Sequence, residues 1–121
     1  MRISVISDDL TGASDCGGQL VRFGLKVSVV VQEHSKKNND YDAVIYNTDS
    51  RSVTGIEAYE KVKKVCDTIK SGPVDLVYKK IDSTMRGNIG AEINAIYDSF
   101  SPDFVIIAPA FPVNGRKVIN G

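Results

Sequence analysis

Four short stretches of this 121-residue chain gather side chains that can bind or activate a small polar molecule. They span residues 7–12, 47–51, 79–88 and 109–116, and each follows an apolar, strand-like run. Carboxylates in these stretches accept hydrogen bonds from hydroxyl groups, and guanidinium groups bind a carboxylate or phosphate through paired N–H donors. A small, polyhydroxylated, acidic molecule would satisfy both kinds of group.

The basic residues of these stretches are the first candidates for holding an anion. Arg51, Arg86 and Arg116 offer planar forks of N–H donors, and Lys80 adds a point charge. The candidates for contacts with hydroxyl groups are carboxylates, hydroxyls and one amide: Asp9, Asp49, Asp82, Ser83, Thr84 and Asn88.

Strands and helices alternate along the sequence, and this alternation determines where the polar stretches meet. Apolar runs predict strands at residues 2–6, 26–31, 41–46, 74–78 and 103–108. Apolar residues three or four positions apart predict helices that begin near Thr11, Thr54 and Asn88. Such alternation is typical of βαβ units, so we expect an α/β, three-layer, Rossmann-like domain with a mostly parallel sheet of about five strands.

Each predicted helix has an apolar stripe that must pack on the sheet. The first helix stops at Gly24, and a capping box of Thr54 and Glu57 opens the second. The stripes are Ala13, Cys16, Leu20 and Phe23; Ala58, Val62, Val65 and Ile69; and Ile89, Ile93, Ile96, Tyr97 and Phe100. The valines of residues 26–31 predict a strand covered on both faces. The polar connection that follows, over residues 32–40, predicts a surface loop in which His34 is solvated.

Ligands bind outside the carboxyl ends of the strands in a parallel sheet, and four of the five predicted strands release a polar stretch there. The alternative is that these are ordinary loops, in which Thr11, Thr54 and Asn88 cap helices and the charged residues pair with one another. Capping does not account for three arginines and paired lysines on an edge that also carries four aspartates. We therefore favour a binding pocket at this edge.

Composition excludes several classes of partner. The 15 basic and 15 acidic residues give a formal net charge of zero, so we expect no nucleic-acid or membrane binding. The apolar runs are strand-sized, and no removable signal segment precedes the first strand. Cys16 and Cys66 form neither a metal-ligand spacing nor a disulfide framework, so we expect small core residues in a cytoplasmic protein.

Three common phosphate-binding patterns are not matched. Residues 12–18 are glycine-rich, but they lack the Gly-Lys-Ser/Thr ending of a P-loop and the G-x-G-x-x-G dinucleotide fingerprint. Phosphatases of the haloacid dehalogenase type carry D-x-D-x-T, and aligning Asp9 and Thr11 with that motif puts Ser7 in place of the nucleophilic aspartate. The chain therefore shows no nucleotide motif and no phosphatase nucleophile.

The polar stretches carry a resemblance to a known family. They read Ser-Asp-Asp-Leu-Thr-Gly-Ala at 7–13 with Asp15, Asn-Thr-Asp-Ser-Arg at 47–51, Tyr-Lys-Lys-Ile-Asp-Ser-Thr-Met-Arg-Gly-Asn-Ile-Gly-Ala-Glu at 78–92, and Ala-Pro-Ala-Phe-Pro at 108–112 with Gly115 and Arg116. In this order they resemble the N-terminal domain of the four-carbon acid sugar kinases. The resemblance covers essentially the whole chain, and the block at 78–92 is its most specific part.

The resemblance implies an ATP-dependent kinase that phosphorylates the terminal hydroxyl of threonate, erythronate or a 3-oxo-tetronate. Residues 1–121 would form the N-terminal sugar-acid-binding domain, and a C-terminal domain absent from this chain would bind ATP with its Mg²⁺. The chain itself would hold no metal or cofactor and would be inactive alone. Because Asn120-Gly121 is a hairpin-turn signal with no returning strand after it, we expect a truncated chain.

The implied site residues are all polar or glycine. The implied substrate contacts are Asp9, Arg51, Lys80, Asp82, Ser83 and Arg86, followed by Asp8, Thr11, Asp15, Asn88, Gly115 and Arg116. Arg51, Arg86 or Lys80 would hold the carboxylate. Asp9 and Asp82 would bind hydroxyls, and they are the two catalytic candidates, because one aspartate could orient or deprotonate the attacking hydroxyl.

A second class of function fits the same residues. The chain could be a standalone sugar-acid-binding or regulatory module that senses its ligand without transforming it. The expected partners are a small-molecule sugar acid and, for a kinase, the missing ATP-binding domain, while a homo-oligomer stays open.

Overall fold

The computed structural model describes residues 1–31 and 40–120, so His34 and most of the predicted loop at 32–40 lie outside the described residues. The elements follow one another in the order β1 (Ile3–Ser7), α1 (Leu10–Arg22), β2 (Val27–Val30), β3 (Ala43–Asn47), α2 (Gly55–Lys70), β4 (Leu76–Lys80) and α3 (Ile89–Phe100). A short 3-10 turn at Pro112–Asn114 follows. The predicted α/β class is confirmed.

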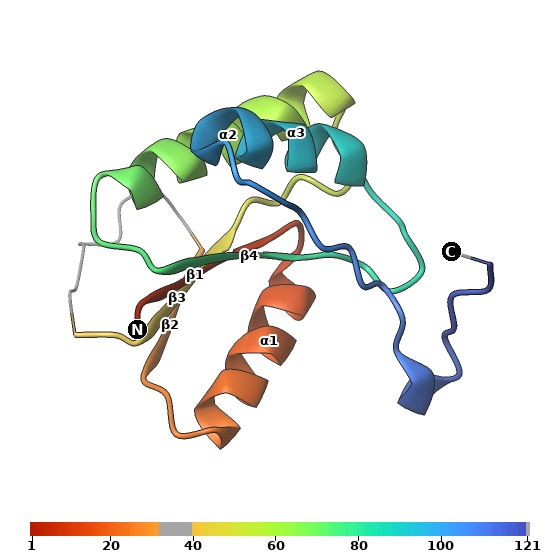
Figure 1. Ribbon diagram of the computed structural model, residues 1–121, viewed down its shortest axis with the longest axis horizontal. Coiled ribbons are helices and arrows are strands. Elements are labelled where there is room, and N and C mark those ends of the chain that lie inside the picture. The colour runs from red at the N-terminus through yellow and green to blue at the C-terminus, as the bar shows by residue number, and fades with distance from the viewer. Residues whose placement is uncertain (32–39, 121) are drawn as a thin grey trace.

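The sheet is parallel, with the strands in the order β2-β3-β1-β4. Helix α1 covers one face, and α2 and α3 lie together on the other (Figure 1). This arrangement gives the three predicted layers. The register aligns Ser7, the last residue of β1, with Asn47 of β3 and Lys80 of β4. Three strands therefore end side by side, and the polar stretches after them begin at one level.

Alternation along the central strand β1 builds two cores. Val5 packs with Ala13 and Ile45 on the α1 face, whereas Ile6 packs beneath α2 and α3. Cys66 is fully buried with Ile6, and Cys16 packs at the margin of the α1 core. The prediction of a core residue is confirmed for Cys66, whereas Cys16 is only partly buried.

Helix α1 begins and ends for identifiable reasons. Gly24 follows the helix with φ +85°, a conformation that glycine adopts without steric cost, so the predicted stop is confirmed. Phe23 was expected on the apolar stripe, but it lies beyond the last turn and is 83% exposed. Gly17 allows close packing, because a Cβ there would lie 3.2 Å from Cδ1 of Ile45. The helix thus rests directly on the sheet.

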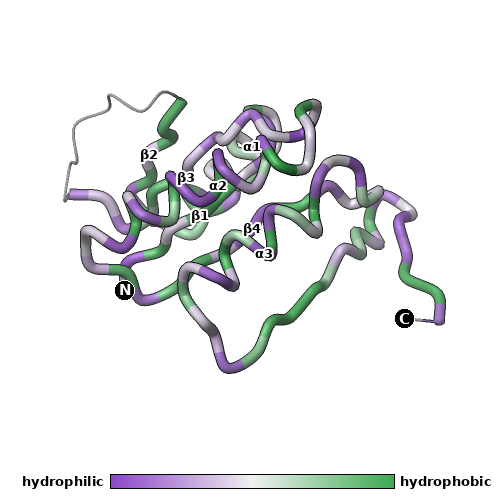
Figure 2. Tube along the Cα trace, turned by 90° about the horizontal axis from the view of Figure 1, so that it is seen from above, coloured by the Kyte–Doolittle hydropathy of each residue, from purple (hydrophilic) through white to green (hydrophobic). Residues whose placement is uncertain are grey.

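Two strand predictions need correction. The sheet has four strands, since residues 103–108 form no strand and do not pair with β4. Figure 2 shows this apolar segment running outside α3 towards the C-terminus. A groove of about 630 Å³ lies between it, the free side of β4 and α3. Strand β2 lies at the edge of the sheet, and the expected coverage of both its faces is incomplete, since none of its residues is fully buried and Val29 is 36% exposed. The apolar, β-branched composition of residues 103–108 favours a strand, but composition does not determine whether a segment pairs with a neighbouring strand.

Among the described residues, no helix is long and apolar enough to cross a membrane.

Candidate functional site

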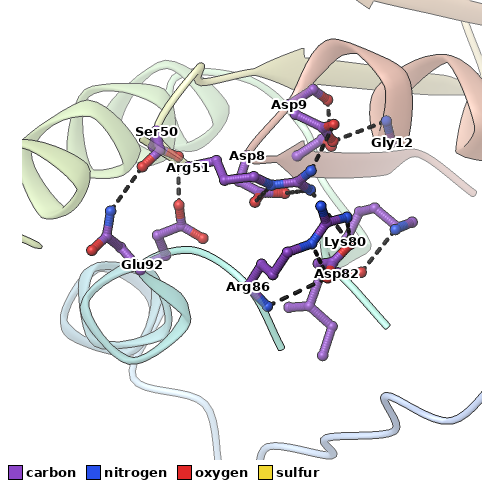
Figure 3. Close-up of polar contacts among 12 residues, drawn as sticks. Asp8, Asp9, Gly12, Ser50, Arg51, Lys80, Asp82, Arg86 and Glu92 are labelled. Atoms are coloured by element: carbon purple, nitrogen blue, oxygen red, sulfur yellow. Dashed lines mark hydrogen bonds and ion pairs between the residues drawn. The ribbon is translucent and has the colours of Figure 1, made fainter. Parts of the chain in front are cut away.

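The carboxyl ends of β1, β3 and β4 place the polar stretches in contact with one another. Asp8 and Asp9 follow β1, Arg51 lies four residues beyond β3, and Asp82 and Arg86 follow β4. Figure 3 shows these side chains converging over the end of the sheet. The predicted meeting point is therefore present in the fold. We call Asp8, Asp9, Arg51, Asp82 and Arg86 the aspartate–arginine cluster.

Arg51 lies at the centre of this cluster. Its Nε and Nη2 donate to the two carboxylate oxygens of Asp8 at 2.7 and 3.1 Å, and its Nη1 donates to Asp9 at 2.9 Å. Asp82 is a third acidic neighbour at 4.0 Å. The hydrogen bonds that Arg51 donates to Asp8 raise the pKa of Arg51 above its ordinary value. The side chain of Asp8 is only 2% exposed, so Arg51 balances a charge that water does not reach.

Asp82 and Arg86 form a second, more open pair. Arg86 donates to both carboxylate oxygens of Asp82, at 2.9 and 2.8 Å, and Thr84 donates to Asp82 from its backbone N–H at 3.1 Å and from its hydroxyl. These hydrogen bonds hold the pKa of Asp82 far below its usual range, and those from the Arg86 side chain have the largest effect. The Asp82 side chain is 9% exposed, but Arg86 is 65% exposed. Asp82 is therefore a weak base, whereas Arg86 presents its charge to solvent.

The turn between Asp82 and Arg86 depends on unusual backbone angles. Met85 has φ +61° and Gly87 has φ +94°. A Cβ on Gly87 would lie 3.1 Å from a carboxylate oxygen of Asp8, so both the angle and the space favour glycine. This turn carries Arg86 back over Asp82.

Asp9 is the most accessible of the three carboxylates, with its side chain 26% exposed. It is also the N-cap of α1, where it accepts a hydrogen bond from the Gly12 N–H at 3.0 Å. Thr11 was expected to open this helix, but α1 begins at Leu10 and Asp9 takes the capping position. Asp9 therefore combines a structural role with a carboxylate oxygen near solvent.

Lys79 and Lys80 are the last two residues of β4, which ends two residues beyond the predicted strand end at 78. Because they are adjacent in a strand, their side chains point to opposite faces of the sheet. Lys80 packs towards α1, where its Cγ would lie 3.5 Å from a Cβ on Gly12, and its ammonium donates to the Ile81 carbonyl at 2.8 Å. Lys79 pairs with Glu92 of α3 at 2.9 Å. Only Lys80 is on the face occupied by Asp9 and α1.

The remaining predicted residues divide into three groups. Thr11 and Asp15 are exposed on α1, and no hydrogen bond or ion pair within residues 1–31 and 40–120 joins them to the aspartate–arginine cluster. Arg116 donates to Ser83, which brings the C-terminal turn with Gly115, at φ +71°, to the end of β4. Asn88 is the N-cap residue of α3, but its amide makes no cap bond and donates instead to the carbonyls of Ser50 and Val53.

The carboxylates of the cluster are engaged by arginines rather than open to Mg²⁺. Cation sites for Mg²⁺ use carboxylate oxygens that keep lone pairs free for the ion. Each aspartate here is already bonded to an arginine, and no group of three acidic, histidine or cysteine residues in the described part of the chain is arranged to hold a metal ion. As arranged here, these carboxylates do not match a Mg²⁺ site.

Comparison with known proteins assigns the chain to a family. The sugar-binding N-terminal domain family matches residues 3–121. This chain belongs to that family. Curated relatives include D-threonate kinase of Salmonella typhimurium, at 38% identity over all of the chain, and D-erythronate kinase of Heliobacterium modesticaldum, at 37% identity over 98% of it. The predicted relationship to the N-terminal domain of the four-carbon acid sugar kinases is confirmed.

The match covers only part of each relative. This chain spans 29% of the D-threonate kinase, 28% of the D-erythronate kinase and 30% of a 3-oxo-tetronate kinase of Haemophilus influenzae. A solved structure from Bordetella bronchiseptica, described as a domain of unknown function with bound citrate in a domain-swapped dimer, superimposes with a TM-score of 0.92 at 31% identity. It is matched over 32% of its length by the whole of this chain. The fold seen here is thus shared with the matching part of that solved structure.

The sequence analysis did not identify the buried residues behind the aspartate–arginine cluster. Thr48, Ser50 and Glu92 are at most 7% exposed and are bonded to one another or to the ends of β1 and β4. The signal for Glu92 was its position, three residues after Ile89 and four before Ile96, inside an apolar helical stripe. A charged residue at such a position indicates a buried partner.

Proposed function

We propose that this chain is the sugar-acid-binding domain of an ATP-dependent, cytoplasmic kinase that phosphorylates the terminal hydroxyl of a four-carbon sugar acid. One observation carries the proposal: acidic and basic side chains alternate at the end of the sheet, with Arg86 and Asp9 both reaching solvent. The names of the relatives, which are threonate, erythronate and 3-oxo-tetronate kinases, support this substrate class.

The geometry favours a division of roles among the basic residues. Arg51 donates three hydrogen bonds to Asp8 and Asp9, and its side chain is only 22% exposed. Its main role is therefore to fix the positions of those two aspartates. Arg86 is 65% exposed and keeps N–H groups that Asp82 does not use. We therefore assign the substrate carboxylate to Arg86, with Lys80 and Arg116 as supporting cations.

The two catalytic candidates also differ. Phosphoryl transfer requires positioning and charge neutralisation more than removal of a proton, so a carboxylate that accepts a hydrogen bond from the attacking hydroxyl is sufficient. Asp82 is held by Arg86 and Thr84 with a strongly lowered pKa, which suits it to orienting a hydroxyl rather than to removing its proton. Asp9 keeps the more open carboxylate, and we assign to it the attacking hydroxyl of the sugar acid.

In the complete enzyme, a C-terminal domain outside residues 1–121 would bind ATP with its Mg²⁺. Residues 1–121 carry no nucleotide-binding motif, which supports this division. The Bordetella relative supports two further points. Citrate is a hydroxylated acid like the proposed substrates, and a domain-swapped dimer supports a homo-oligomer for this protein.

Calorimetric titration of the chain tests the proposal. D-threonate or D-erythronate is expected to bind with a measurable heat, whereas ATP with Mg²⁺ is not. The matched control ligand is butyrate, which carries the carboxylate but no hydroxyls and should bind at least tenfold more weakly. Equal binding of butyrate and the sugar acids, or binding of ATP tighter than of either sugar acid, would overturn the proposed division of labour.

A further inference from the structure

A buried ion pair lies behind the loop that carries Arg51. Glu92 of α3 is 0% exposed, and its Oε2 lies 2.9 Å from the ammonium of Lys79, whose side chain is 9% exposed. Burying two charges is costly unless further hydrogen bonds satisfy them. The partner of the other carboxylate oxygen of Glu92 is therefore informative.

That partner is Ser50, which is fully buried. The Ser50 hydroxyl donates to Oε1 of Glu92 at 2.5 Å and lies 2.6 Å from the hydroxyl of Thr48. Thr48 in turn donates to the carbonyl of Ser7 at 2.9 Å. A continuous set of polar contacts thus runs from α3, through the loop after β3, to the end of β1. Figure 3 shows Ser50 pointing towards Glu92 while the next residue, Arg51, points into the aspartate–arginine cluster.

The backbone of Ser50 is fixed as well. Its N–H donates to the Asp8 carbonyl at 3.0 Å, and its own carbonyl accepts from the Asn88 amide at 2.9 Å. The preceding residue, Asp49, has φ +47°, which is unfavourable for a residue with a side chain. The surrounding contacts must stabilise this turn. Ser50 is therefore the point at which α3 holds the loop that delivers Arg51.

We propose that Glu92 is a positioning residue, which acts through Ser50 to orient Arg51 between Asp8 and Asp9. Glu92 does not touch Arg51, and its effect passes through one side chain and one backbone step. A charged acceptor suits this task because hydrogen bonds to an ionised carboxylate are roughly twice as strong as those between neutral groups. The ligand-binding part of the inference rests on the proposed function, but the orientation of Arg51 does not.

The test follows the Arg51 side chain directly by NMR in the full chain. The Arg51 Nε–H is bonded to Asp8 at 2.7 Å, so its exchange with solvent is expected to be slow. Ser50→Ala removes only the hydroxyl link and should accelerate this exchange at least tenfold. The double variant Glu92→Met with Lys79→Met removes both buried charges and the acceptor of the Ser50 hydroxyl together, and it should give the same acceleration. The Arg86 Nε–H, bonded to Asp82, should be unchanged in every variant.

Ser99→Ala is the matched control. Ser99 is also a buried serine, at 6% exposure, and its hydroxyl donates to Ala95 within α3, away from the loop. Its removal should cost similar stability and leave Arg51 exchange unchanged. Unchanged exchange in Ser50→Ala, or equal acceleration in Ser99→Ala, would overturn the inference. The same Ser50→Ala variant should bind D-threonate at least threefold more weakly; if the unmodified chain does not bind D-threonate, the proposed function fails while the exchange result still decides the role of Glu92.

Discussion

Replacing Arg51 by alanine should destabilise the domain strongly, because the substitution leaves Asp8 buried without its counter-charge. Asp8 is 2% exposed and loses two hydrogen bonds, at 2.7 and 3.1 Å, and Asp9 loses a third at 2.9 Å. Removing one partner of a buried pair costs about 3–5 kcal/mol. Since Arg51 is itself 22% exposed, water reaches part of the pair, and we expect about 3 kcal/mol.

The loss can be measured at pH 7 by urea unfolding, which gives the free energy, and by thermal unfolding, which gives Tm. For a domain of this size, about 3 kcal/mol corresponds to a fall in Tm of roughly 12 °C. Arg51→Ala combined with Asp8→Asn should recover part of the stability, because the buried group is then neutral. Arg22→Ala is the control, since Arg22 is exposed at the far end of α1 and should change stability by no more than about 0.5 kcal/mol.

Two outcomes would refute this reasoning. An Arg51→Ala variant within about 1 kcal/mol of the unmodified domain would mean that Asp8 is not held by the ion pair seen here. Additive losses in the double variant would mean that Asp8 and Arg51 do not interact, since residues in contact show coupling.

Three further predictions follow from the same cluster. Arg86→Ala should weaken D-threonate or D-erythronate binding at least tenfold by calorimetry, with Arg22→Ala as the control; unchanged affinity would remove Arg86 from the site. Asp82 has a folded pKa below its unfolded value of 3.8, so the stability it contributes is present above that value and lost as the pH falls below it. The gap between the urea midpoints of the unmodified domain and Asp82→Asn should therefore be constant well above pH 3.8 and narrow progressively as the pH falls below 3.8; a gap that stays constant in acid would contradict the pairing of Asp82 with Arg86. Gly87→Ala should lower stability by about 1–3 kcal/mol, because φ is +94° and the new Cβ would press on Asp8; a neutral or stabilising result in thermal unfolding would show that the turn is different.

Much of the fold could be predicted because local signals agree with the tertiary structure. The capping box of Thr54 and Glu57 is present as expected and opens α2. Three of the four residues expected on the α2 stripe, Ala58, Val62 and Ile69, are buried, and Val65 packs against the same core. These features depend on residues close together in sequence, which is why the sequence pattern was sufficient.

Features that depend on distant neighbours were harder to predict. Residues 103–108 have strand-like composition, but a strand also requires a pairing partner, and β4 does not pair with them. The predicted strand ends at residue 78, two residues before the end of β4, because two adjacent lysines, Lys79 and Lys80, are typical of a loop. In the fold, Lys79 is neutralised by Glu92 of α3.

The site was predicted as a location but not as a set of contacts. Register in the parallel sheet was enough to bring Asp9, Arg51 and Asp82 to one edge. Which arginine pairs with which aspartate depends on backbone turns. The turn at Met85, with φ +61°, brings the Arg86 side chain within hydrogen-bond distance of Asp82. No spacing rule in the sequence encodes that turn.

The most direct test of the central claim is an amide NMR titration of the chain with D-threonate and D-erythronate. Binding at the end of the sheet predicts chemical shift changes centred on Asp9, Lys80 and Arg86, with little change at Leu76 and Ile96, which line the apolar groove beside β4. Absence of shifts with both acids, or shifts concentrated along that groove, would contradict the proposal that this sheet edge binds a four-carbon sugar acid.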